Sequence, residues 1–166
     1  MANVTLRGKE QNTIGDLPAV GSKAPDFSLT TSSLKDVTLQ SFEGKKKLLY
    51  ILPSLDTPVC AKTTKQLNEL MASVSHSVAC IVSADLPFAQ GRFCGIEKLK
   101  NITVLSMMRS KKFAKDYGVL LVDGPLAGVT ARAVVVLDED NTVLYSDLIK
   151  EISDDPDFSN AIAALR

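Results

Sequence analysis

An uninterrupted apolar run at residues 48–52 restricts the folds open to this chain more than any other feature. The run reads Leu48-Leu49-Tyr50-Ile51-Leu52 and ends at Pro53. Continuous apolarity indicates a central strand with both faces covered, because a strand with one solvated face alternates between apolar and polar residues. Residues 78–82, 102–105 and 131–137 predict three further strands.

Helical segments alternate with these strands. After the first strand, Leu67, Leu70, Met71 and Val74 recur with helical spacing, and residues 87–94, 111–117 and 156–166 predict three more helices. This order predicts an α/β fold with a mixed sheet flanked by helices, parallel through the crossovers and antiparallel at a final hairpin around residues 138–141. Residues 4–14 alternate around a glycine and predict an N-terminal β-hairpin, and residues 27–29 and 37–39 predict two brief strands. The thioredoxin-like architecture fits this order.

The size and charge of the chain limit its possible partners. Its 166 residues fit one domain over 1–166, and 45% hydrophobic residues exclude a disordered chain. Nineteen basic and nineteen acidic residues balance, which argues against nucleic acid or an anionic membrane as partner. No apolar run approaches the roughly 20 residues of a membrane span. Residues 1–16 lack the apolar core of a secretion signal, so we expect a cytoplasmic protein with reduced thiols.

Cys60 is the strongest candidate for a reactive residue among the three cysteines. Thr57 suits the N-cap of the helix after the first strand, and Pro58 suits its first position. Cys60 then lies in the first turn, where free N–H groups and the helix dipole stabilise a thiolate, the reactive form of cysteine. The alternative is a small apolar residue packed beneath the helix.

The other two cysteines differ in their surroundings. Cys94 lies in a second strand-to-helix passage, where it is either packed beside Phe93 or able to attack an oxidised Cys60. Cys80 lies within a predicted buried strand, and we interpret it as core packing. The single histidine, His76, is expected in a polar turn. With no second histidine and no Cys-x-x-Cys, the sequence argues against a structural zinc site.

Two basic features allow contrasting interpretations. Arg132 precedes the apolar residues 133–137 and is either the solvated end of a strand or a donor to the thiolate and to an oxygen substrate. The run Lys45-Lys46-Lys47 is predicted to be a solvated turn.

Three segments together resemble a known family. Pro53-x-x-x-Thr57-x-x-Cys60 resembles the active-site motif of peroxiredoxins, and residues 53–60 in full resemble the bacterial thiol peroxidase subfamily. Residues 85–94 are similar to the resolving-cysteine helix of that subfamily. Ala131-Arg132-Ala133 resembles the segment with the family arginine. The resemblance extends over essentially the whole chain.

The resemblance implies a thioredoxin-like fold and an antioxidant oxidoreductase, a thiol-dependent peroxidase for hydrogen peroxide and organic (alkyl or lipid) hydroperoxides. It implies that Cys60 is the peroxidatic cysteine and Cys94 the resolving cysteine of an atypical two-cysteine enzyme, joined by an intrachain disulfide. Thr57, Pro53 and Arg132 would complete the pocket. Thioredoxin would reduce the disulfide, and a homodimer is expected. No metal, haem or flavin is needed, because sulfur supplies the redox chemistry.

Two other functions are compatible with the same residues. The same two cysteines would serve a redox sensor that passes its oxidation to a partner protein. An oligomeric binding module would instead contain unreactive, buried thiols. If a disulfide does form between Cys60 and Cys94, their Cα atoms must come within about 7 Å. Because each cysteine is expected at or near the start of a different helix, we expect oxidation to unwind the chain around one or both.

Overall fold

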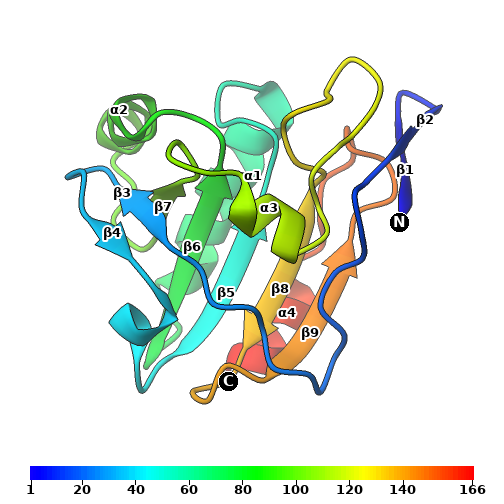
Figure 1. Ribbon diagram of the computed structural model, residues 1–166. Coiled ribbons are helices and arrows are strands. Elements are labelled where there is room, and N and C mark those ends of the chain that lie inside the picture. Colours follow the sequence, from blue (N-terminus) through cyan, green and yellow to red (C-terminus); the bar gives the residue numbers. More distant parts are fainter.

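A seven-stranded sheet organises the computed structural model, which describes residues 1–166 (Figure 1). The strand order is β4-β3-β7-β6-β5-β8-β9. The bounds are β3 (Leu29–Thr31), β4 (Asp36–Val37), β5 (Lys46–Ile51), β6 (Ser77–Ser83), β7 (Thr103–Ser106), β8 (Ala133–Leu137) and β9 (Val143–Leu148). Strands β5, β6 and β7 run parallel, and the remaining pairings are antiparallel. The predicted mixed sheet is therefore confirmed.

Four α-helices and one 3-10 helix cover the sheet. They are α1 (Pro58–Met71), α2 (Pro87–Glu97), α3 (Lys112–Asp116), α4 (Ser159–Leu165) and η1 (Leu39–Phe42). Helices α1 and α4 lie behind the sheet in Figure 1, and α3 lies in front. None of the helices is long and apolar enough to cross a membrane.

Several predicted boundaries were wrong by a few residues. The strand predicted at 37–39 ends at Val37, because the chain turns there into η1. The last helix begins at Ser159 rather than at residue 156. Helix α2 continues to Glu97, three residues beyond the prediction, and ends where Lys98 takes the left-handed conformation with φ 56°.

Apolar side chains of β5 alternate between two cores, one on each face of the sheet. Leu49 and Ile51 pack into the core that contains Phe113 of α3. Leu48 and Tyr50 pack into the core that contains Leu67 of α1. Both faces of β5 are therefore covered, which confirms the interpretation of the run at 48–52.

The N-terminal hairpin is confirmed and consists of β1 (Asn3–Leu6) and β2 (Lys9–Asn12). Its two-residue turn places Arg7 at φ 51° and Gly8 at φ 79°. Positive φ at both turn residues matches the type I′ turn that suits the twist of a hairpin. The hairpin also bonds to the chain after β9, because the Ile152 amide donates to the Thr5 carbonyl over 2.8 Å.

Lys47 corrects the prediction of a solvated turn at residues 45–47. Lys45 is exposed, but Lys47 is fully buried within β5. Its Nζ donates to Asn141 Oδ1 over 2.7 Å and to the carbonyls of Asp138 and Glu139 over 3.4 and 3.3 Å. Burial lowers the pKa of Lys47. The β8–β9 turn therefore surrounds the Lys47 amine, although the local sequence pattern predicts that this amine is solvated.

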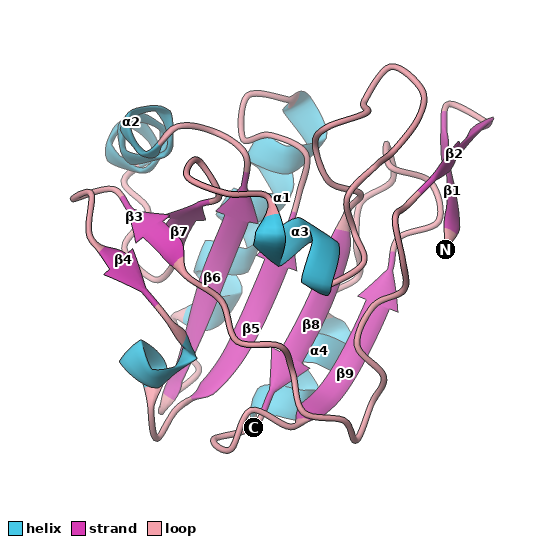
Figure 2. Cartoon of the chain, in the orientation of Figure 1, coloured by secondary structure: helices cyan, strands magenta, loops and turns pink.

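Antiparallel pairing brings distant segments together at one end of the sheet. Ile51, the last residue of β5, pairs with Ala133, the first residue of β8, and Ala133 pairs with Leu148 at the end of β9. The connection from β5 to α1, the chain before β8 and the chain after β9 therefore meet here. Figure 2 shows these loops gathered at the same end of the sheet as the hairpin.

Candidate active site

Cys60 is the third residue of α1, in the register that the sequence predicts. Thr57 occupies the N-cap with φ −117° and ψ 149°, and Pro58 is the first helical residue. The Thr57 hydroxyl does not cap the helix; it donates to the Ser54 carbonyl over 3.0 Å. The amides of Val59 and Cys60 consequently donate to no group of the chain. These free N–H groups and the helix dipole make the first turn favourable for negative charge.

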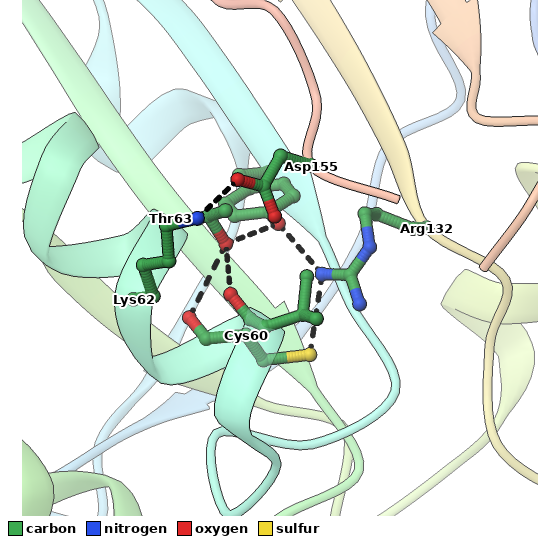
Figure 3. A network of polar contacts seen from close by, with 7 residues as sticks. Cys60, Lys62, Thr63, Arg132 and Asp155 are labelled. Atoms are coloured by element: carbon green, nitrogen blue, oxygen red, sulfur yellow. Dashed lines mark hydrogen bonds and ion pairs between the residues drawn. The ribbon is translucent and has the colours of Figure 1, made fainter. Parts of the chain in front are cut away.

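Arg132 contacts the sulfur of Cys60. Its Nη1 donates to Cys60 Sγ over 3.2 Å, as Figure 3 shows, and to the Tyr50 hydroxyl over 2.7 Å. Its Nε donates to the Ile152 carbonyl over 3.0 Å. Only 2% of Arg132 is exposed, so the interpretation as a solvated strand end is wrong. A buried cation needs such partners, and here one of them is a thiol that can ionise.

Tyr50 and Thr63 extend this contact into a chain of hydrogen bonds. The Tyr50 and Thr63 hydroxyls lie 2.7 Å apart, and Thr63 Oγ1 donates to the Val59 carbonyl over 2.7 Å. Tyr50 therefore donates to Thr63 while it accepts from Arg132. Burial raises the pKa of Tyr50, which keeps this donor protonated.

Sequence reasoning missed both Tyr50 and Thr63. A signal for Tyr50 was present, because its hydroxyl is the only polar side-chain atom in the run at 48–52 and a buried tyrosine hydroxyl usually finds a partner. Thr63 carries no such local signal, since its role depends on the position of Tyr50 across the interface between β5 and α1.

A cavity of about 650 Å³ lies beside this network. Pro53, Thr57 and Arg132 all line it, so the structure brings together the three residues that the family resemblance implies for a pocket. The other walls come from the N-terminal hairpin, the start of α1 and the loops before β8 and after β9. Their apolar side chains are those of Leu6, Val59, Leu126 and Ile152. Cys60 is itself fully buried, against the arginine that lines the cavity.

Cys94 lies near the C-terminal end of α2, so the expectation that it lies near the start of its helix is wrong. It is half-buried, its thiol is free, and burial raises its pKa. With Phe93 it packs against the apolar core that contains Cys60. Cys94 thus packs beside Phe93 and, at the same time, against the core around Cys60.

The remaining predicted residues lie outside this site. Cys80 is fully buried in β6, as expected for core packing, and burial raises the pKa of its thiol to about 12. His76 is exposed in the turn before β6, as expected. No three histidine, cysteine, aspartate or glutamate side chains come together in a way that could hold a metal ion.

Comparison with known proteins gives concordant matches in sequence and structure. Residues 19–165 match the family model described as Redoxin. The thiol peroxidases of Mycobacterium bovis and Mycobacterium tuberculosis are each 49% identical to this chain over 165 residues, which cover 99% of this chain and 99% of theirs.

Solved structures agree with this assignment. A peroxiredoxin-like protein from Aquifex aeolicus is 36% identical with a TM-score of 0.93, covering 99% of this chain and 96% of that one. A thiol peroxidase from Chromobacterium violaceum is 30% identical with a TM-score of 0.91, covering 99% and 95%. These neighbours confirm the thioredoxin-like fold. The chain therefore belongs to the Redoxin family, as a peroxiredoxin-type enzyme of the bacterial thiol peroxidase subfamily.

Proposed function

We propose that this enzyme reduces hydroperoxides with Cys60 as the peroxidatic residue. The Cys60 thiolate attacks the terminal peroxide oxygen, and an S–O bond forms as the O–O bond breaks. The leaving alkoxide or hydroxide takes a proton from solvent to give an alcohol or water, and Cys60 becomes a sulfenic acid. The observation that carries this proposal is the hydrogen bond of 3.2 Å from Arg132 to Cys60 Sγ, which places a buried, oriented cation directly against the reacting sulfur.

The residues around Cys60 are suited to stabilise the charge that develops on the peroxide oxygens. Arg132 is held at both Nε and Nη1, so its guanidinium is already oriented before the substrate arrives. The free amides of Val59 and Cys60 add donors, and the Thr57 hydroxyl, whose proton goes to the Ser54 carbonyl, can accept a hydrogen bond from the hydroperoxide. Pro53, at the wall of the cavity, shields the reacting sulfur from water.

Cys94 completes the cycle as the resolving residue. Its thiolate attacks the Cys60 sulfur, an S–S bond forms, and the sulfenic hydroxyl leaves as water after protonation. Burial raises the pKa of Cys94, so its thiolate forms more readily once local unfolding exposes the thiol to water. Thioredoxin then reduces the intrachain Cys60–Cys94 disulfide by dithiol exchange.

We propose that organic hydroperoxides, as well as hydrogen peroxide, are substrates, because the lining of the cavity suits them. Side chains such as Leu6, Leu126 and Ile152 give it apolar walls next to Arg132, which suits the alkyl or lipid portion of an organic hydroperoxide. By its kinship with bacterial thiol peroxidases, we extend the proposal to a cytoplasmic homodimer that acts in antioxidant defence.

Thioredoxin-coupled peroxide consumption tests this function. The wild-type enzyme should turn over continuously, Cys60→Ser should consume no peroxide, and Cys94→Ser should complete the first oxidation without recycling. Cys80→Ser is the matched control, because it removes a thiol outside the site, and it should retain turnover. Sustained turnover by Cys60→Ser would overturn the assignment, and stoichiometric oxidation of wild type without turnover would indicate a sensor instead.

A further inference from the structure

The carboxylate of Asp85 joins the two segments that carry Cys60 and Cys94. Asp85 lies between β6 and α2, the helix that contains Cys94. Its Oδ1 accepts from Ser54 Oγ over 2.6 Å, and its Oδ2 accepts from the Leu55 amide over 2.8 Å. Ser54 and Leu55 belong to the connection from β5 to α1, which leads to Cys60. These are the only hydrogen bonds between residues 53–57 and a segment beyond α1.

The two hydrogen bonds to Asp85 influence the start of α1 through Ser54 and Leu55. The Ser54 carbonyl accepts from the Thr57 hydroxyl over 3.0 Å, and Thr57 is the N-cap of α1. Leu55 is 4% exposed and packs into the same apolar core as Cys60, against which Cys94 also packs. Holding Ser54 and Leu55 in place therefore fixes both the cap and the packing of the turn that contains Cys60.

Asp85 is itself fixed on the frame of the sheet. Ser83 Oγ donates to its Oδ2 over 2.7 Å, and Ser106 Oγ donates to its carbonyl oxygen. The buried side chain of Gln90, from α2, donates to Ser83 Oγ over 3.0 Å and to the Leu105 carbonyl over 2.9 Å. Hydrogen bonds thus join the carboxylate to β6, β7 and α2, and residues 53–57 are attached to these elements through Asp85.

Side-chain packing between the connection and α2 is incomplete. A cavity of about 170 Å³ separates Leu55 and Asp56 from Arg92 and Phe93 of α2. Fewer van der Waals contacts are therefore lost when the connection moves, so the hydrogen bonds to Asp85 carry more of the attachment.

We propose that Asp85 is a positioning residue whose carboxylate holds residues 53–57, and thereby the first turn of α1, in the state that keeps Cys60 against Arg132. Release of Ser54 and Leu55 from Asp85 lets the first turn of α1 open so that Cys60 can reach Cys94. This inference rests on the proposed function, because formation of the Cys60–Cys94 disulfide is the event that requires the opening. The free energy of such a local opening depends on the few contacts that hold the segment in place.

The variant Asp85→Asn tests the proposal, since its amide nitrogen cannot accept a hydrogen bond. In the reduced protein, hydrogen exchange at the amides of Leu55, Asp56 and Ala61 should become about tenfold faster, the change expected when a hydrogen bond to a charged group is weakened. These amides donate to Asp85, to Ser54 Oγ and to the Thr57 carbonyl, so they report both the connection and the first turn of α1. After a single addition of hydrogen peroxide, the Cys60–Cys94 disulfide should form about tenfold faster from the sulfenic acid. The preceding oxidation of Cys60 should become slower, because Cys60 spends less time against Arg132.

Two further variants keep the test decisive. Asp138→Asn is the control. Asp138 also accepts hydrogen bonds from two backbone amides, those of Asp140 and Thr142, but it lies at the opposite end of the sheet. In this variant the rates of amide exchange, Cys60 oxidation and disulfide formation should all stay unchanged. Ser54→Ala removes one bond to Asp85 from the other side and should change the rates in the same directions by a smaller factor. It serves as the primary test if Asp85→Asn does not fold.

The outcomes separate this proposal from the function on which it rests. Unchanged exchange at the amides of Leu55, Asp56 and Ala61 in Asp85→Asn would overturn the positioning role, and so would faster exchange with an unchanged rate of disulfide formation. Absence of a Cys60–Cys94 disulfide in the wild-type enzyme would instead overturn the proposed function. The exchange measurement on reduced protein would then still report whether Asp85 holds the connection.

Discussion

The guanidinium of Arg132 donates to the sulfur of Cys60 over 3.2 Å, although 72 positions separate the two residues in the sequence. Strand pairing produces this contact. Because β8 runs antiparallel to β5, Arg132 precedes β8 at the end of the sheet where β5 leads into α1. Val134 and Val136 of β8 pack on the α1 face, so Arg132, two residues before Val134, points to that face as well.

Arg132→Lys should slow the oxidation of Cys60 about 100-fold, the effect of losing an oriented donor at a reacting oxygen. The lysine keeps the charge, but it cannot reproduce the fork that reaches Ile152, Tyr50 and Cys60 together. Rapid-quench measurement of sulfenic acid formation gives the rate constant. Arg109→Lys is the control, because Arg109 is exposed and pairs with Asp36 on the far edge of the sheet. A rate for Arg132→Lys equal to that of the control would contradict a role in the reaction.

Tyr50→Phe should lower both the free energy of unfolding, by about 1–2 kcal/mol, and the rate of Cys60 oxidation. The hydroxyl accepts from Arg132 and donates to Thr63, so its loss frees the guanidinium to rotate. Chemical denaturation and rapid quench measure the two effects.

Tyr117→Phe is the matched control for this change. Its hydroxyl donates to the Pro25 carbonyl over 2.8 Å, and the ring packs in the core on the other face of the sheet. This variant should lose a similar amount of stability and retain the wild-type rate of oxidation. Equal loss of rate in the two variants would show that Tyr50 acts only through stability.

Glu151 should make the attachment of the hairpin sensitive to acid. Hydrogen bonds from Ser153 and then from the Gly8 amide lower its pKa from 4.5 to about 2. Because the pKa is lower in the folded state, the stabilising contribution is complete above pH 4.5 and is lost as the pH falls toward 2. Urea denaturation across this range should show a smaller loss of stability with acid for Glu151→Gln than for wild type. Identical pH dependence would mean that these bonds do not stabilise the fold.

Cys80 should resist alkylation in the folded protein. Burial raises the pKa of its thiol to about 12, so almost no thiolate exists at neutral pH, and the side chain is fully covered. Mass spectrometry after treatment with iodoacetamide should find Cys80 modified only when the protein has been denatured first. Modification of native protein at Cys80 as fast as at Cys60 would contradict its placement in the core.

Local sequence patterns were sufficient for the features that depend on neighbouring residues. The run at 48–52 predicted a strand covered on both faces, and Thr57 with Pro58 predicted the register that places Cys60 in the first turn of α1. The N-terminal hairpin likewise follows from the alternation of residues 4–14 around a central glycine. Each of these features is determined within a few residues of chain.

Features that depend on the pairing of distant segments could not be predicted in the same way. Lys47 is buried because the β8–β9 turn folds over its amine, which the lysine run itself does not indicate. Asp85 reaches Ser54 and Leu55 only because β5 and β6 are neighbours in the sheet. A local feature was also missed at the end of α2, because the helix passes through Gly95 and ends only where Lys98 takes the left-handed conformation.

The identity of the cysteines that pair on oxidation is the decisive test of the proposed catalytic cycle. We propose treating reduced protein with one equivalent of hydrogen peroxide, blocking free thiols, and mapping disulfides by mass spectrometry. We expect one disulfide, Cys60–Cys94 within a single chain, with Cys80 recovered as a blocked free thiol. A disulfide that includes Cys80, or a Cys60 that stops at the sulfenic acid while Cys94 stays free, would contradict it.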